Sequence, residues 1–302
     1  MSTLIAFLWM TMRYRPLLLV LLLPPCTSAQ PLIDLFSVNA LGSPGLDREE
    51  VSATLPLQLD TAGRLLVLDP YYVQWHTSTN GDRYSPVRED NVVETMRGSG
   101  GAVTYVTPLC GGRWKLAVAG IGRYHWSERQ PNGDLQYGGV LLASRVFKPS
   151  LTLRAGVYSN YDAFGWFVIP LLGIDWRIDA KHNLYGILPG VITYEHKCSP
   201  HFHWGATFRA YTSSYGLRSG DYRRLDENPL GLYGDIYFTR NVVLRLEGGW
   251  SCLRQVRGGP GDPLYDPTNT DKDGYADHRI TDAPYARVVL AYRLRLDGPT
   301  QP

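Results

Sequence analysis

The sequence contains little that would mark a helical membrane protein, a nucleic-acid-binding protein or a disulfide-stabilised domain. After residue 29 no apolar stretch reaches about 18 residues, so no transmembrane helix is predicted. The formal net charge of the 302-residue chain is only +2, which gives no reason to expect nucleic acid as a partner. Three of the four cysteines, Cys110, Cys198 and Cys252, follow residue 29; an odd number without a CxxC pair predicts neither a disulfide framework nor a zinc site.

Catalytic motifs are scarce as well. The nucleophile elbow GxSxG is absent, and the positions of the serines and histidines suggest no shared site, so no catalytic residue or cofactor is assigned and the chain is not predicted to be an enzyme. His201 and His203 form half of a metal site, without an obvious third ligand. A barrel-embedded lipid hydrolase stays open as an alternative, because such an enzyme needs no local motif.

The first 29 residues have the order of a secretory signal peptide. Arg13 and Arg15 precede the apolar run 17–23, and Thr27, Ser28 and Ala29 form a small-residue cleavage site. We therefore predict export, with residues 30–302 as the mature domain and Met12 as an alternative start of translation.

Aromatic and glycine-rich strands dominate what remains. The chain has 20 tyrosines, eight tryptophans and 31 glycines, a composition that favours β-structure. In the stretch GIDWRID, Ile174, Trp176 and Ile178 alternate with Asp175, Arg177 and Asp179, as in a strand with one apolar and one charged face. The same alternation recurs in VSATLPLQL (51–59), WKLAVAGIGRYHW (114–126) and AYRLRL (291–296).

Connections between these strands alternate in length. Short turns occur at CGGR, FKPS, DAKHN, CSPH and TRN, whereas longer polar loops are predicted at about 76–99, 127–134, 217–229 and 255–282. This asymmetry predicts an all-β, antiparallel up-and-down transmembrane β-barrel of about 12 to 14 strands over about 32–296, with short turns in the periplasm. The lower number applies if LYGILP (184–189) and VITYEHK do not both cross the membrane. A soluble all-β protein is the alternative.

In a membrane barrel the apolar face contacts lipid and the charged face lines the lumen. Two interpretations of the lumen remain open: a positive lining that favours anions, or a lattice of ion pairs that braces a narrow barrel. Arg287, Arg293 and Arg295 crowd one strand and are predicted to be the unpaired excess. The predicted inward cations are Lys115, Arg123, Arg145, Arg154, Arg177, Arg209, Arg245, Arg287, Arg293 and Arg295, and the predicted inward acids are Asp175, Asp179, Glu195, Asp235 and Glu247.

Two further segments carry candidate sites. Asn269, Asp271, Asp273 and Gly274 resemble the first half of a calcium-binding loop, and Asp277 offers a later carboxylate. The twelfth position is Ile280 rather than Glu, so an acidic, hydrated surface loop is the favoured explanation. Pro189 and Gly190 end the stretch LYGILPG, which either folds inward and constricts the pore or forms a tight turn that shortens two strands.

The central block FGWFVIPLLGIDWRIDAKHNLYGILPG (164–190), with VITYEHK and FRAYTSSYGL, resembles a Bacteroidota outer-membrane β-barrel family known as a domain of unknown function. The resemblance covers about 32–296 and implies a barrel in the bacterial outer membrane, but it implies no activity and no catalytic residue. The expected function is a narrow passive pore or structural barrel for small solutes, surrounded by outer-membrane lipid. A surface receptor that binds partners through its long loops is the second hypothesis.

Overall fold

The computed structural model describes residues 31–79, 92–127, 130–216, 221–260, 276–279 and 281–296. The predicted signal peptide lies outside the described residues. No helix within these ranges is long and apolar enough to cross a membrane. Cys110, Cys198 and Cys252 are free thiols.

Almost every described segment is a β-strand, and the sheet contains one short 3-10 turn, η1 (Cys110–Gly112). The strands are β1 (Leu32–Ser43), β2 (Leu46–Ala53), β3 (Leu55–Gln58), β4 (Leu65–Thr79), β5 (Val92–Leu109), β6 (Trp114–Ser127), β7 (Gln130–Lys148), β8 (Leu151–Asp162), β9 (Gly165–Arg177), β10 (His182–Leu188), β11 (Val191–Ser199), β12 (Phe202–Arg209), β13 (Tyr211–Gly216), β14 (Asp221–Tyr237), β15 (Val242–Pro260), β16 (Ala276–Arg279) and β17 (Ala283–Arg295).

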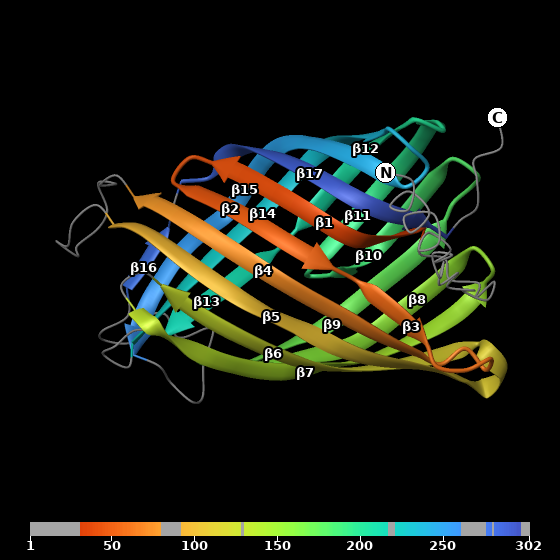
Figure 1. Cartoon of the computed structure of the whole chain (residues 1–302), viewed down its shortest axis with the longest axis horizontal. Coiled ribbons are helices and arrows are strands. Elements are labelled where there is room, and N and C mark those ends of the chain that lie inside the picture. Colours follow the sequence, from red (N-terminus) through yellow and green to blue (C-terminus); the bar gives the residue numbers. More distant parts are fainter. Residues whose placement is uncertain are drawn as a thin grey trace, which may run out of the picture.

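These segments form one closed antiparallel barrel of 14 strands (Figure 1). The segments β2 and β3 follow one another along β4, and β12 and β13 follow one another along β14. Likewise, β16 and β17 both pair with β15. Pairing of β1 with β17 closes the sheet. The predicted fold class is therefore confirmed at the higher of the two strand numbers, because β10 and β11 both join the wall.

The two ends of the barrel differ. The turns at 59–64, 110–113, 149–150, 178–181, 200–201 and 238–241 lie at one end, here called the short-turn end. Both ends of the described chain lie there too, since the Leu296 N–H donates to the Pro31 carbonyl at 2.8 Å. The opposite end is called the loop end. Strands occupy much of what was predicted as loop there: β4 extends to Thr79, β5 begins at Val92 and β15 extends to Pro260.

The outer surface between the two ends is apolar. Outward side chains such as Val38, Val103, Leu172 and Leu232 are between 43% and 66% exposed, whereas Asp175 beside Trp176 is buried. Trp114 and Trp126 delimit this band on β6. Their separation corresponds to about 40 Å of strand, or roughly 30 Å along the membrane normal at a tilt of about 40°. The faces of the stretch GIDWRID are thus inverted relative to a soluble protein, as predicted.

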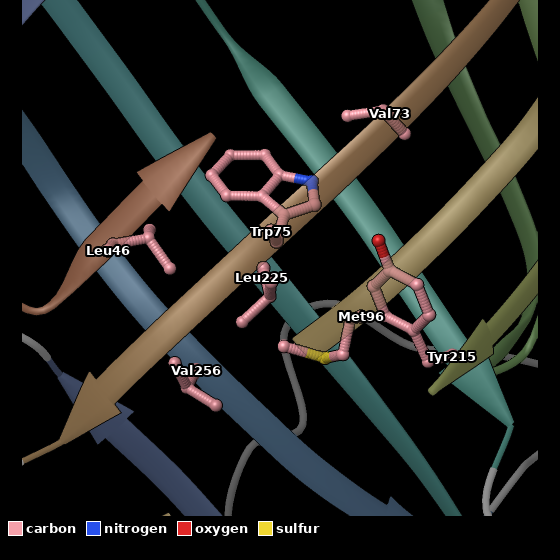
Figure 2. Close-up of a cluster of buried hydrophobic side chains, with 7 residues drawn as sticks. All are labelled: Leu46, Val73, Trp75, Met96, Tyr215, Leu225 and Val256. Carbon is pink, nitrogen blue, oxygen red and sulfur yellow. The ribbon is translucent and has the colours of Figure 1, made fainter. Parts of the chain in front are cut away.

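Near the loop end the polar side chains face outward and the apolar side chains face inward, the reverse of the arrangement in the apolar band. This reversal explains why the strands continue beyond the band. On β4 the polar Gln74 and His76 face outward, while Val73 and Trp75 are buried inside. Figure 2 shows the interior cluster, here called the apolar plug: Leu46, Val73, Trp75, Met96, Tyr215, Leu225 and Val256. A polar exterior over an apolar interior is the pattern of a protein in water, so this part of the barrel is built to project beyond the apolar band.

Candidate functional site

A dense network of ion pairs fills one side of the barrel interior. Arg245 donates two hydrogen bonds to Asp235, at 2.7 and 2.8 Å, and Arg293 donates a third to the same carboxylate at 2.7 Å. Arg293 also makes a two-bond contact with Asp34, at 2.6 and 3.0 Å, which connects β17 to β1 across the barrel seam. Paired geometry of this kind satisfies the planar guanidinium and compensates the burial of its charge.

The same network continues around Glu195, which is completely buried on β11. Arg295 donates to both of its carboxylate oxygens, at 2.8 and 2.9 Å, and Asn183 donates at 2.7 Å. His203 contacts the same carboxylate at 3.2 Å, whereas His201 lies exposed in the preceding turn, so the two histidines do not share a site.

A second ion pair involves another arginine of β17 and a buried carboxylate. Arg287 donates to Glu247 at 2.9 Å, and the Tyr285 hydroxyl donates to the same carboxylate at 2.9 Å. Since Arg293 and Arg295 also contact carboxylates, the prediction that Arg287, Arg293 and Arg295 lack partners is wrong. Their partners lie on β11, β14, β15 and β1, which the sequence of β17 alone could not reveal.

Four of the other predicted inward cations fall into three groups. Arg154 contacts the buried Asp175 across β8 and β9. Arg177 and Arg209 form no ion pair with the residues that the structure describes. Arg145 was expected inside but is exposed, and its guanidinium lies over Trp114 at 5.3 Å, because its long stem can follow the apolar exterior toward the short-turn end.

Asp179 was also expected inside the barrel but belongs to the exposed turn between β9 and β10. The backbone N–H groups of Lys181 and His182 donate to its carboxylate at 2.7 and 2.9 Å. These hydrogen bonds, chiefly the one from Lys181, lower the pKa of the Asp179 carboxyl. The residue is therefore an anchor of the turn rather than part of the interior charge network.

The lumen is narrowed by β13 rather than by the segment that contains Pro189 and Gly190. Those two residues are exposed in the turn between β10 and β11, where Ile187 and Val191 keep their strand pairing. By contrast, among the described residues β13 pairs as a strand with β14 alone, and it crosses the interior to contact β6 and β7 near the loop end (Figure 1).

Side chains from the opposite wall hold β13 in this position. His125 Nδ1 lies 2.8 Å from the Ser214 carbonyl oxygen, and Gln136 Nε2 donates to the same oxygen at 2.8 Å and to the Ser214 hydroxyl at 3.1 Å. The Tyr215 ring stacks on His125 at 5.1 Å. These contacts satisfy an otherwise unpaired strand edge, and they are here called the β13 latch.

Beneath the apolar plug lies a cavity of about 340 Å³, bounded by β2, β4, β6 and β13. Its polar lining includes Arg48, Glu50, Asp69, Arg123 and His125. The residues that line it are Arg48, Glu50, Ser52, Ala53, Thr54, Asp69, Pro70, Tyr71, Val73, Arg123, His125, Ala210, Tyr211, Thr212 and Ser213. The neighbouring strands have small inward residues at Gly100, Ala102, Ala117 and Ala119. The interior on this side of the barrel therefore stays open, whereas on the other side the charge network fills it.

One outward cluster bears on the hydrolase alternative. Thr95 Oγ1 lies 3.2 Å from His76 Nδ1, and Gln74 Nε2 lies 2.8 Å from His76 Nε2. Arg97 donates to Gln74 Oε1, which fixes the amide orientation and makes His76 Nε2 an acceptor. The proton is then on Nδ1 and points at Thr95, so the imidazole in this arrangement cannot withdraw a proton from that hydroxyl.

No metal site emerges from the part of the chain that is described. No group of three or more His, Cys, Asp or Glu side chains in it is placed to hold a metal ion. The calcium candidates Asn269, Asp271 and Asp273 lie outside the described residues, as does the side chain of Asp277.

The fold defines the chain as a barrel of the outer-membrane type. No family model matches the chain, and no curated protein matches it. Among solved structures it is similar to a mutant of the TodX monoaromatic hydrocarbon channel, at 8% identity and a TM-score of 0.38, over 92% of this chain and 93% of that chain. It is also similar to outer membrane phospholipase A from Escherichia coli, at 12% identity and a TM-score of 0.32, over 86% and 90%.

Proposed function

We propose that the protein is a passive pathway for small solutes in the bacterial outer membrane, with a solute-binding cavity in its lumen and a loop end closed by β13. The observation that carries this proposal is the cavity of about 340 Å³ directly beneath β13. A purely structural barrel would have no need to combine an open interior volume with a strand segment that crosses it.

The attachment of β13 suggests how the pathway opens. One edge is bonded to β14 by backbone pairing, while the side chains of His125 and Gln136 and the Ala163 N–H contact Ser214 from the opposite wall. Each such hydrogen bond contributes about 0.5–1.5 kcal/mol, so the three hydrogen bonds of the β13 latch are weak enough to break transiently. The ion-paired side of the barrel keeps the wall rigid while β13 moves.

Bilayer conductance of the refolded mature chain tests the proposal. We expect small, brief openings in the wild type, and at least a tenfold larger open fraction in the double variant His125→Ala/Gln136→Ala, since about 1.5–4.5 kcal/mol of latch contacts is removed. The control His196→Ala/Gln58→Ala makes the same changes of residue type away from β13 and should behave as wild type. Absence of conductance from both wild type and latch variant, with folded protein shown by heat-modifiable gel migration, would refute the pathway.

The receptor hypothesis makes a different prediction. It places function in the loop end, so deletion of 259–281 would abolish the biological function while leaving conductance unchanged. Loss of function on that deletion, combined with a non-conducting latch variant, would favour the receptor.

A further inference from the structure

The cavity lining contains two opposite charges, Asp69 and Arg123, that form no ion pair with each other in the described structure. Asp69 accepts a hydrogen bond from Thr54 and has no cation within 4.0 Å in the part of the chain that the structure covers. Arg123 donates one hydrogen bond, to the Tyr158 hydroxyl at 2.8 Å, and forms a longer ion pair with Asp162, in which 3.8 Å separates the guanidinium nitrogen from the carboxylate oxygen. The lining therefore offers one carboxylate and one guanidinium to a solute.

The remaining charged pair of the cavity is already neutralised. Arg48 and Glu50 are in direct contact, and Asn39 donates to Glu50 at 3.3 Å. The Arg48 guanidinium also lies 4.2 Å from the centre of the Tyr211 ring. This pair shapes the wall of the cavity, whereas Asp69 and Arg123 remain as the charged groups that a solute can contact.

The strand register places Asp69 and Arg123 on two strands, β4 and β6, that are separated by β5. Tyr71 is opposite Gly100, and Gly100 is opposite Arg123, while Asp69 lies two residues from Tyr71 on the same face of β4. From strand spacing and rise, the Cα atoms of Asp69 and Arg123 are about 12 Å apart, so their side chains can converge on one small molecule. A Cβ at Gly100 would lie 2.9 Å from the Arg123 Cα, so a larger residue does not fit between Tyr71 and Arg123 unless the neighbouring strand shifts.

Size and lining narrow the class of ligand further. A volume of about 340 Å³ corresponds to about 11 water molecules at roughly 30 Å³ each, enough for a solute of roughly 10 to 15 non-hydrogen atoms. Val73, Pro70, Tyr71 and Tyr211 add apolar and aromatic walls beside the charges.

We propose that the cavity binds a small zwitterion, an α-amino acid or dipeptide with an apolar side chain. Its ammonium group contacts Asp69, its carboxylate contacts Arg123, and its side chain lies against Tyr71 and Tyr211. This assignment rests on the solute pathway proposed above and names the substrate class of that pathway.

Titration calorimetry of the folded protein in detergent tests the assignment with three probes: phenylalanine, N-acetylphenylalanine and phenylalanine amide. Phenylalanine carries both charges, whereas each analogue lacks one. We expect phenylalanine to bind at least tenfold more tightly than either analogue, as is typical of charge-assisted hydrogen bonds. This comparison uses the wild type and does not depend on whether a variant folds.

Two variants assign each charge to its residue. Asp69→Asn should remove the preference for phenylalanine over N-acetylphenylalanine, and Arg123→Gln should remove the preference over phenylalanine amide. Asp60→Asn and Arg64→Gln, which change an exposed pair outside the cavity, should keep the wild-type order.

Equal binding of the three probes, or binding of none, would overturn the assignment. If the latch variant still conducts in that case, the solute pathway stands and only the substrate class fails; if it does not conduct, both fail. Glycerophosphoethanolamine provides a last discrimination, because tighter binding of this lipid headgroup than of phenylalanine would also overturn the amino-acid assignment.

Discussion

Replacement of Glu195 by Gln tests whether the interior charges stabilise the barrel. Glu195 is fully buried and receives two hydrogen bonds from Arg295, at 2.8 and 2.9 Å. Loss of its charge would leave the arginine without its carboxylate partner in a low-dielectric interior. Breaking a buried ion pair in this way costs about 3–5 kcal/mol, a large share of the roughly 5–15 kcal/mol that stabilises a typical folded domain.

Urea unfolding of the refolded barrel in lipid vesicles, followed by tryptophan fluorescence, measures this loss. Glu49→Gln is the matched control, because Glu49 is exposed on β2 and should change the free energy of unfolding by no more than about 0.5 kcal/mol. The double variant Glu195→Gln/Arg295→Met removes both charges and fills similar volume, so it should recover most of the lost stability.

Two results would refute this reasoning. A loss below about 1 kcal/mol in Glu195→Gln would mean that Arg295 does not need its partner, as expected if water solvates the pair. A double variant no more stable than the single variant would mean that the loss comes from the other contacts of Glu195, such as those with Asn183 and His203.

Three further predictions follow from other parts of the barrel. A Cβ at Gly98 would lie 2.4 Å from His125 Cδ2, so Gly98→Ala should displace His125 from the β13 latch. Loss of one hydrogen bond of about 1 kcal/mol should raise the open fraction in bilayers about fivefold, and an unchanged open fraction contradicts this. Leu172→Arg, on the apolar exterior, should cost about 2–4 kcal/mol in vesicle unfolding, whereas Glu49→Arg should be nearly neutral, and equal losses would mean that the apolar band is misplaced. Arg209→Gln in the latch variant should weaken anion preference, seen as a reversal potential closer to zero under a salt gradient, and no shift would show that Arg209 does not face the solute path.

The alternation of residue types was sufficient to predict the barrel and most of its faces. Ile174 and Trp176 point outward and Asp175 is buried because lipid, rather than water, surrounds the wall. Successive residues of a strand point to opposite faces, so the alternation in the sequence already separates the two sets of residues. The identity of ion-pair partners was not predictable. Arg293 contacts Asp34, 259 residues away, and such a contact depends on strand number and stagger, which no local pattern contains.

The candidate site was missed for a related reason. The β13 segment YTSSYG has the alternation of an ordinary strand. Nothing in it shows that, within the described ranges, β13 pairs on one side alone because β10 and β11 end early. The second inversion of faces had a visible signal, since Val73 and Trp75 alternate with Gln74 and His76 in the opposite sense to the strands nearer the short-turn end. The cavity itself depends on small inward residues such as Gly100, whose effect appears only once β4, β5 and β6 are side by side.

Leu296 and Pro31 are joined by a hydrogen bond, so the two ends of the described chain are close enough to be linked covalently. The order in which the strands are synthesised could then be changed without changing their order around the barrel. A chain joined across these residues and reopened in the turn between Ser199 and Phe202 would begin with β12 and end with β11. It would keep all strand pairings, and both new termini would still lie at the short-turn end. Such a permuted chain would have the same barrel but a different final strand for the cell's insertion machinery to bind. Comparing its membrane insertion with its folding would show which residues are needed for insertion and which for folding.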